Sequence, residues 1–108
     1  MNKGDVLWVS FNPSIGGEIQ KTRPAVIVSN DAANSVLNRL VVVPLTSKTD
    51  RIYPGQTFVT VLGERRKAMA DQITTISKLS VRNLIGTLSS RDVLSVERAI
   101  LQHLAIRQ

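Results

Sequence analysis

The stretch that organises this chain is residues 16–30, GGEIQKTRPAVIVSN. Its first half is a glycine-led polar loop that carries the carboxylate of Glu18 and the cations of Lys21 and Arg23. Its second half, AVIVS, is an apolar run typical of a buried strand. Pro24 lacks an N–H, so it suits the first residue of that strand, and it favours an extended backbone at Arg23. Charged groups at the end of a rigid strand are a first candidate for binding or catalysis.

Working outward, five further segments are predicted to be short strands because they are apolar, β-branched or alternate with a period of two: residues 6–11, 40–45, 56–61, 68–73 and 84–88. Residues 40–45 are continuously apolar, which predicts burial on both faces, with Pro44 at a bend or a sheet edge. Trp8 is expected in the core. Asp71 and Gln72 are expected at the inner end of their strand.

Residues 89–106 are predicted to form a helix, with Ser89 and Asp92 spaced as a capping box and apolar residues at 3.6 spacing. A brief helical turn is expected after Asn30 or Asp31. Five or six strands about ten residues apart plus one helix predict a mainly β, α+β fold. We expect a small, curled antiparallel barrel with the helix packed as a lid, in one domain over residues 1–108.

The chain has 14 Lys and Arg against 8 Asp and Glu, a net charge of +6 and a pI near 10.6. This balance predicts a polyanionic partner, although a basic surface that serves only solubility is the alternative. There is no cysteine, which excludes disulfides, thiolate zinc sites and a cysteine nucleophile. No signal peptide or membrane span is recognisable, so we expect a cytoplasmic protein.

The candidate functional residues are polar groups at predicted loop starts and strand ends, namely Glu18, Lys21, Arg23, Thr46, Ser47, Asp71 and Gln72. They suit phosphate chemistry, because an arginine holds a phosphate through two parallel hydrogen bonds and a hydroxyl donates one more. If the substrate is RNA, its 2′-hydroxyl is the nucleophile, so the chemistry calls for no metal and no cofactor. The single histidine, His103, is interpreted as structural. The proton-transfer group stays open.

Two other basic segments are candidates for RNA contact. Residues 48–55 form a predicted loop that carries Lys48 and Arg51. Residues 65–67 are three consecutive cations that we interpret as a solvated hairpin tip, with phosphate contact as the alternative.

Five blocks of this sequence resemble the MazF/PemK/Kid toxins of bacterial toxin–antitoxin modules. In order, they are GDVLWV at residue 4, NP followed by GGE at residue 12, TRPAVIVSN at residue 22, VPLTS at residue 43 and ADQITTI at residue 70. The blocks keep the family's order and spacing and span nearly the whole chain.

The resemblance implies an SH3-like barrel that forms a homodimer and cleaves single-stranded RNA, an mRNA interferase. It implies products with a 2′,3′-cyclic phosphate and a free 5′-hydroxyl, and neutralisation by an antitoxin with an acidic disordered tail. Arg23 matches the family's catalytic arginine and Thr46 its phosphate-holding hydroxyl, while Glu18 matches a glutamate that several members need for activity. Asp71 and Gln72 match a polar pair near the RNA. The loops around residues 12–22 and 48–55 are expected to choose the bases.

Two residues depart from the PemK/Kid branch of the family. Met69 stands where that branch has an arginine, and its histidine base has no counterpart in the first loop. The interpretation centred on Arg23 and Thr46, as in the MazF branch, is therefore favoured over one centred on Asp71.

Two rival functions belong to other classes: a gyrase poison of the CcdB type, and a basic barrel that binds RNA without cutting it. Structural roles also stay open for single residues. In these structural interpretations, Arg23 forms an ion pair with Asp71 or Glu18, and Thr46 caps a turn. Asp71 accepts hydrogen bonds from the backbone N–H groups of a loop.

Overall fold

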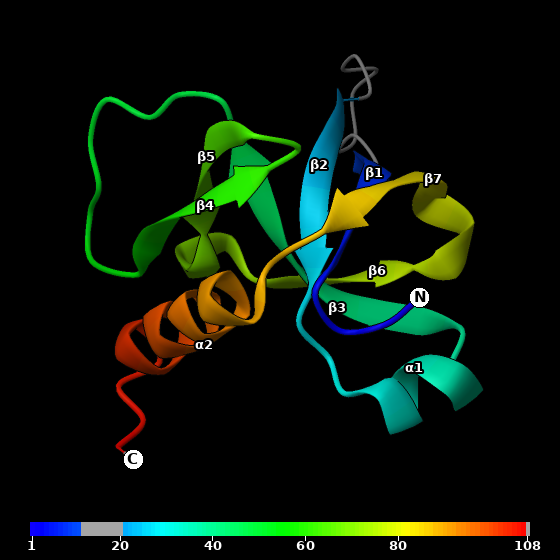
Figure 1. Cartoon of the computed structure of the whole chain (residues 1–108). Coiled ribbons are helices and arrows are strands. Elements are labelled where there is room, and N and C mark those ends of the chain that lie inside the picture. The colour runs from blue at the N-terminus through cyan, green and yellow to red at the C-terminus, as the bar shows by residue number, and fades with distance from the viewer. Residues whose placement is uncertain (12–20, 108) are drawn as a thin grey trace, which may run out of the picture.

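The chain forms an antiparallel sheet of seven strands with a helix, α2, packed against one end (Figure 1). The computed structural model describes residues 1–11 and 21–107. The strands are β1 Asp5–Phe11, β2 Lys21–Ile27, β3 Arg39–Thr46, β4 Gln56–Val61, β5 Glu64–Met69, β6 Thr74–Ser77 and β7 Val81–Thr87. The helices are α1 Asp31–Val36 and α2 Ser90–His103, and two 3-10 turns, η1 Ala70–Gln72 and η2 Lys78–Ser80, follow β5 and β6.

Strand β3 lies at the centre of the sheet and is buried on both faces, as predicted. It pairs with β2 along one side, and along the other side first with β6 and then with β5. Pro44 lies where the partner changes, between Val42, the last residue paired with β6, and Leu45, the first paired with β5. The missing N–H of Pro44 therefore falls where β3 changes partner on one side, so no ladder hydrogen bond to β5 or β6 is lost there.

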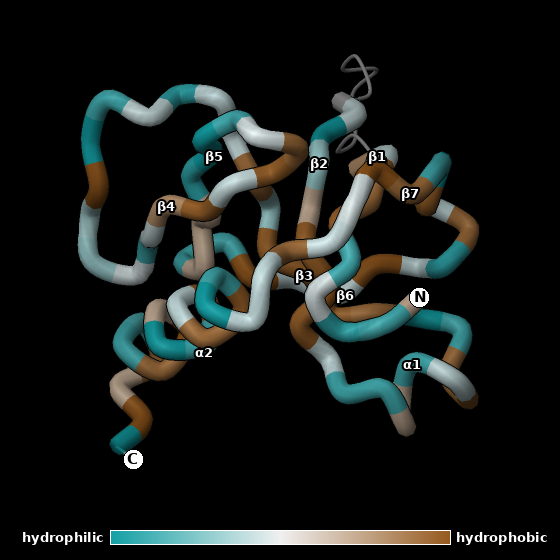
Figure 2. The backbone as a smooth tube through the Cα atoms, in the orientation of Figure 1, coloured by the Kyte–Doolittle hydropathy of each residue, from teal (hydrophilic) through white to brown (hydrophobic). Residues whose placement is uncertain are grey.

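The two faces of the central strands carry separate apolar clusters. Val6, Val26 and Val43 pack with β4, β5 and α2 on one face, whereas Leu7, Ala25 and Leu40 pack with Ile76 on the other. Figure 2 shows this apolar colouring along the inner strands and hydrophilic colouring along the outer turns of α2. Because the central strands are covered by apolar clusters on both faces, their sequences are continuous apolar runs rather than alternating patterns.

The sheet is curled but stays open, and it has seven strands rather than the five or six predicted. Its strand order is β4-β5-β3-β2-β1-β7, with β4 and β7 at the two outer edges, and β6 lies outside this order and pairs with β3 alone. The edges lean together, since the side chain of Leu62 lies 3.5 Å from the position a Cβ would take on Gly86. The predicted curled, mainly antiparallel fold with a C-terminal helix is therefore confirmed, and its sheet stays open rather than closing on itself.

Pro24 lies inside β2 rather than at its first residue, which corrects the predicted strand start. Residues 21–24 of β2 pair with β1, whereas pairing with β3 begins only at Ala25. The edge of β2 that faces away from β1 is therefore free of β3 at Pro24, and an edge position tolerates a residue without an N–H.

The three cations of residues 65–67 lie in β5 and not in a hairpin tip. The turn consists of Leu62 and Gly63 alone, both at positive φ (51° and 79°), as in a two-residue type I′ hairpin. The guanidinium of Arg65 stacks 3.5 Å above the centroid of the Phe58 ring on the neighbouring strand. The interpretation of the three cations as a solvated tip is therefore wrong.

The remaining elements follow the sequence closely. Ser89 caps α2 by accepting a hydrogen bond from the N–H of Asp92 at 3.1 Å, and Asn30 caps α1. Helix α2 ends at His103, three residues earlier than predicted, because Ala105 is left-handed (φ 56°). Neither helix among the described residues is long and apolar enough to cross a membrane.

Candidate active site

A basic pocket of about 300 Å³ lies where the ends of β2 and β3 meet β5. We call it the basic pocket, and its lining residues are Trp8, Thr22, Arg23, Pro24, Leu45, Thr46, Ser47 and Arg66. It brings together three of the residues singled out in the sequence, Arg23, Thr46 and Ser47, from segments more than 20 positions apart. Their proximity agrees with the expectation that they form one site.

Strand register places Arg23 beside Thr46. Ala25 and Pro44 are the last β2–β3 pair, and Arg23 and Thr46 each lie two residues beyond that pair, where both line the basic pocket. Arg23 is held from the other side by its pairing with Val9 in β1. The guanidinium is thus carried by a paired strand, and it is half-buried.

The hydroxyl of Thr46 is oriented by the backbone that follows it. Its Oγ1 accepts a hydrogen bond from the N–H of Lys48 at 3.3 Å, so Thr46 does cap a turn. Because an oxygen that accepts from the backbone keeps its own proton, Thr46 still has a hydrogen bond to donate to a ligand. The turn-capping and ligand-binding roles are therefore compatible.

Arg66 and Trp8 belong to the pocket and were not assigned to it from the sequence. Arg66 adds a second guanidinium beside Arg23 and forms an ion pair with Glu64 at 3.1 Å. Trp8 is 37% exposed, so its expected place in the core is wrong. In the sequence, the run of cations at residues 65–67 allowed two interpretations, a phosphate contact or a solvated turn. Only the structure, in which Arg66 lies in β5, distinguishes the two.

The electrostatics of the basic pocket favour an anion. Two arginines line it, and none of its described lining residues is acidic. Among the described residues, Asp71 does not pair with Arg23, which removes one of the structural roles considered for Arg23. Glu18 lies outside the described residues, and so does the side chain of Lys21. The fork of Arg23 is thus directed at a pocket suited to a phosphate.

Asp71 and Gln72 do not line the basic pocket. They lie exposed on η1, after β5 has ended, and not at the inner end of a strand as expected. Asp71 accepts a hydrogen bond from Nε2 of Gln56 at 3.4 Å, and its N–H donates to the carbonyl of Gly55 at 3.1 Å. Gln56 in turn accepts from the N–H of Tyr53 at 3.0 Å. These bonds attach the 48–55 loop to η1.

The 48–55 loop is held at its middle by buried and stacked groups. The ammonium of Lys67, 9% exposed, donates to the carbonyl oxygen of Arg51 at 3.1 Å. The guanidinium of Arg51 donates to the Tyr53 hydroxyl at 3.1 Å and lies 5.9 Å from its ring centroid. Lys48 is exposed and follows the pocket residue Ser47 directly. The loop therefore presents Arg51 and Lys48 on a braced backbone.

His103 packs against Gly55, with Nδ1 3.2 Å from the position a Cβ would take there. It does not line the basic pocket, which agrees with a structural role. Among residues 1–11 and 21–107, no group of three His, Asp or Glu side chains is placed to hold a metal ion.

The sequence model of the PemK-like, MazF-like toxins of type II toxin–antitoxin systems matches residues 2–104 of the chain. The chain belongs to the PemK/MazF toxin family. Its resemblance to that family, carried by five short blocks, is thereby confirmed.

Individual PemK/MazF proteins are similar to this chain over most of its length. The endoribonuclease MazF9 of Mycobacterium tuberculosis is 35% identical over 96% of this chain and 96% of its own length. The endoribonuclease toxin MazF of Escherichia coli is 36% identical over 68% of this chain and 66% of its own length. A MazE–MazF structure from Deinococcus radiodurans superposes with a TM-score of 0.79 at 26% identity, covering 99% of this chain and 97% of that one.

Proposed function

We propose that this endoribonuclease toxin cuts single-stranded RNA at a short specific sequence, without a metal ion, by attack of the substrate's own 2′-hydroxyl. The observation that carries the proposal is the juxtaposition of Arg23 and Thr46 in a pocket whose described lining is basic and free of acids. Membership of the PemK/MazF family and the endoribonuclease names of its relatives support the same reaction class.

In the proposed reaction the 2′-oxygen bonds to phosphorus as the bond from phosphorus to the 5′-oxygen breaks. The 2′-hydroxyl loses its proton and the leaving 5′-oxygen gains one, which gives a 2′,3′-cyclic phosphate and a 5′-hydroxyl. Arg23 holds the non-bridging oxygens through its two parallel N–H groups, where charge builds up in the transition state. Thr46 donates one further hydrogen bond, and Glu18 assists.

RNA on either side of the cut follows the basic surface. Ser47, Lys48 and Arg51 continue from the pocket along the 48–55 loop, which together with Lys21 at the start of β2 and the residues before it selects the bases. Because Asp71 and Gln56 tether the 48–55 loop to η1, Asp71 acts on RNA through the position of that loop. Gln72 is exposed on the same 3-10 turn, and it contacts the RNA at the outer edge of this basic surface.

We also propose that the toxin is a cytoplasmic homodimer that a cognate antitoxin neutralises. The MazE–MazF complex of Deinococcus radiodurans supports an antitoxin partner. An acidic, disordered antitoxin tail suits a partner with a net charge of +6, because opposite charges steer association and a disordered segment covers a long groove.

The test is incubation of the purified chain with a mixed-sequence single-stranded RNA in EDTA, followed by mapping of the cuts and analysis of the ends. We expect discrete cuts that carry 2′,3′-cyclic phosphate. Arg23→Ala should lower the rate by about 10²-fold or more, since loss of one transition-state donor has effects of that size. Arg91→Ala removes an equal charge from the exposed side of α2 and is the matched control.

Circular dichroism and gel filtration show whether both variants keep the fold and the oligomeric state. Normal cleavage by a folded Arg23→Ala variant refutes the assignment of Arg23. Intact RNA with the unmodified chain refutes the proposed reaction, and a DNA supercoiling assay then tests gyrase poisoning.

A further inference from the structure

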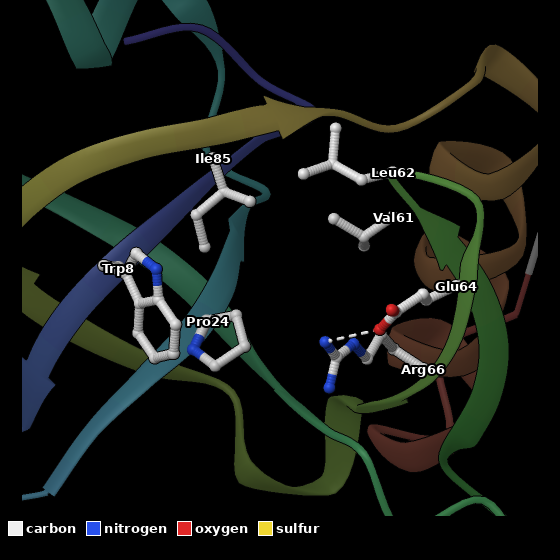
Figure 3. Close-up of a pocket in the computed structure, with 7 residues that line it drawn as sticks. All are labelled: Trp8, Pro24, Val61, Leu62, Glu64, Arg66 and Ile85. Carbon is white, nitrogen blue, oxygen red and sulfur yellow. Dashed lines mark hydrogen bonds and ion pairs between the residues drawn. The ribbon is translucent and has the colours of Figure 1, made fainter.

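A second pocket, of about 290 Å³, adjoins the basic pocket on the side of the β4–β5 hairpin. We call it the hairpin pocket, and its lining residues are Trp8, Pro24, Val61, Leu62, Glu64, Arg66 and Ile85 (Figure 3). Trp8, Pro24 and Arg66 line both pockets. A ligand bound through a phosphate in the basic pocket therefore has its neighbouring groups at the mouth of the hairpin pocket.

The walls of the hairpin pocket are flat and apolar on two sides. Figure 3 shows the Trp8 indole beside Pro24 on one side, with Leu62, Val61 and Ile85 on a second side. Trp8 and Pro24 are paired residues on β1 and β2, so their side chains lie on one face of the sheet. An exposed aromatic ring beside a phosphate-binding pocket is the usual platform on which a single-stranded base stacks.

Leu62 is held in a backbone conformation that its side chain disfavours. Its φ is 51°, and its side chain is 76% exposed, so burial does not account for leucine at this turn position. Asn, Asp or Gly is preferred there because these residues tolerate positive φ. Strain held at the edge of a pocket is characteristic of a residue that contacts a ligand.

The third side of the hairpin pocket is the ion pair of Glu64 and Arg66 (Figure 3). The pair uses Oε2 of Glu64 at 3.1 Å, and among the described residues Oε1 has no hydrogen-bond partner. The side chain of Glu64 is 72% exposed and that of Arg66 29%, so an apolar side chain in this pocket would displace water mainly from Arg66 and return no hydrogen bond. The edge of a base satisfies both charges, because an exocyclic amino group donates to a carboxylate and a ring acceptor takes an N–H from arginine.

We propose that the hairpin pocket is a nucleobase subsite that binds the base next to the cleaved phosphate and prefers a base with an exocyclic amino group over uracil. This inference rests on the proposed function, since it takes the basic pocket to hold the RNA backbone. Trp8 stacks on one face of the base, Leu62 and Ile85 cover its other side, and Glu64 accepts from the amino group.

The experiment uses the fluorescence of Trp8, the single tryptophan of the chain. The probes are fluorescein-labelled 2′-O-methyl hexamers of adenine, cytosine and uracil, which cannot be cleaved because the attacking hydroxyl is blocked. Anisotropy reports RNA binding, and quenching of Trp8 reports stacking. We expect the adenine and cytosine hexamers to quench Trp8 and to bind about tenfold more tightly than the uracil hexamer.

Variants separate the parts of the subsite. Leu62→Ala should weaken binding of the cytosine hexamer about tenfold, and Glu64→Gln should remove most of the difference between cytosine and uracil. Glu97→Gln is the matched control, because it removes the carboxylate of the other ion pair among the described residues, with Lys3, and should change neither quantity.

The outcomes are distinct from those of the cleavage assay. Quenching without cleavage of natural RNA refutes the proposed reaction and leaves the subsite standing, whereas cleavage with no quenching overturns the subsite. Hexamers that bind without quenching, or that fail to bind, also overturn it. If only a peptide of alternating acidic and apolar residues changes the Trp8 emission, the pocket receives an antitoxin and the inference is wrong.

Discussion

Replacement of Leu62 by asparagine is expected to make the protein more stable and to weaken RNA binding. The left-handed backbone of Leu62, at φ 51°, costs about 1–2 kcal/mol for a residue with a bulky side chain. Asparagine tolerates this conformation, and asparagine followed by Gly63 is the preferred sequence of a type I′ hairpin. The substitution should therefore recover most of this backbone strain of about 1–2 kcal/mol.

The loss that opposes this gain is small. Leu62 is 76% exposed, so only about a quarter of it is buried, and Gly86 is one of its neighbours. Full burial of a leucine contributes about 1.5–3 kcal/mol, so the lost contact costs about 0.6 kcal/mol. The net expectation is a gain of about 1 kcal/mol in the free energy of unfolding, or about 4 °C in Tm for a domain of this size.

The assay is thermal unfolding followed by circular dichroism, with Leu62→Ala as the matched variant. Alanine loses the same apolar contact but keeps the left-handed strain, so its Tm should fall by about 2 °C. Both variants should bind the cytosine hexamer more weakly. A Leu62→Asn protein no more stable than the unmodified chain, or an equal gain in Leu62→Ala, refutes the argument that Leu62 is strained for the sake of a ligand.

Three further predictions concern single interactions. Asn34→Ala should lower the free energy of unfolding by about 1–3 kcal/mol in urea titrations, because buried Asn34 donates to the Ser29 carbonyl at 2.9 Å and bonds to its hydroxyl; an unchanged midpoint would contradict this. Ser89→Ala should cost about 1 kcal/mol by the same measurement through loss of the α2 cap, and a cost near zero would show that the cap is dispensable. Lys48→Gln should make the plot of log affinity for single-stranded RNA against log salt less steep by about 0.7, and an unaltered slope would place Lys48 away from phosphate.

The candidate site was predictable where local sequence carries its cause. Arg23 next to Pro24 and Thr46 at the end of an apolar run are signals within a few residues, and the structure brings both to one pocket. The sequence could not decide whether Arg66 lines a pocket or lies in a solvated turn. Its role depends on Leu62 and Gly63 completing the turn before β5 begins. Asp71 was misplaced for a similar reason, since the change from β5 to a 3-10 turn has no strong local signal.

The sequence by itself determined the apolar strands, the capped helix α2, the basic charge and the family. Each of these depends on side-chain type and spacing over a few residues, and the hydrophobic effect, capping and Coulomb attraction act on such patterns directly. Only the tertiary structure decided that the sheet stays open, that Trp8 is exposed and that Arg66 joins Arg23. These features arise from the twist of the sheet and from strand register, which bring residues 8, 24, 62 and 66 to one place, and neither twist nor register is written in any single stretch of the chain.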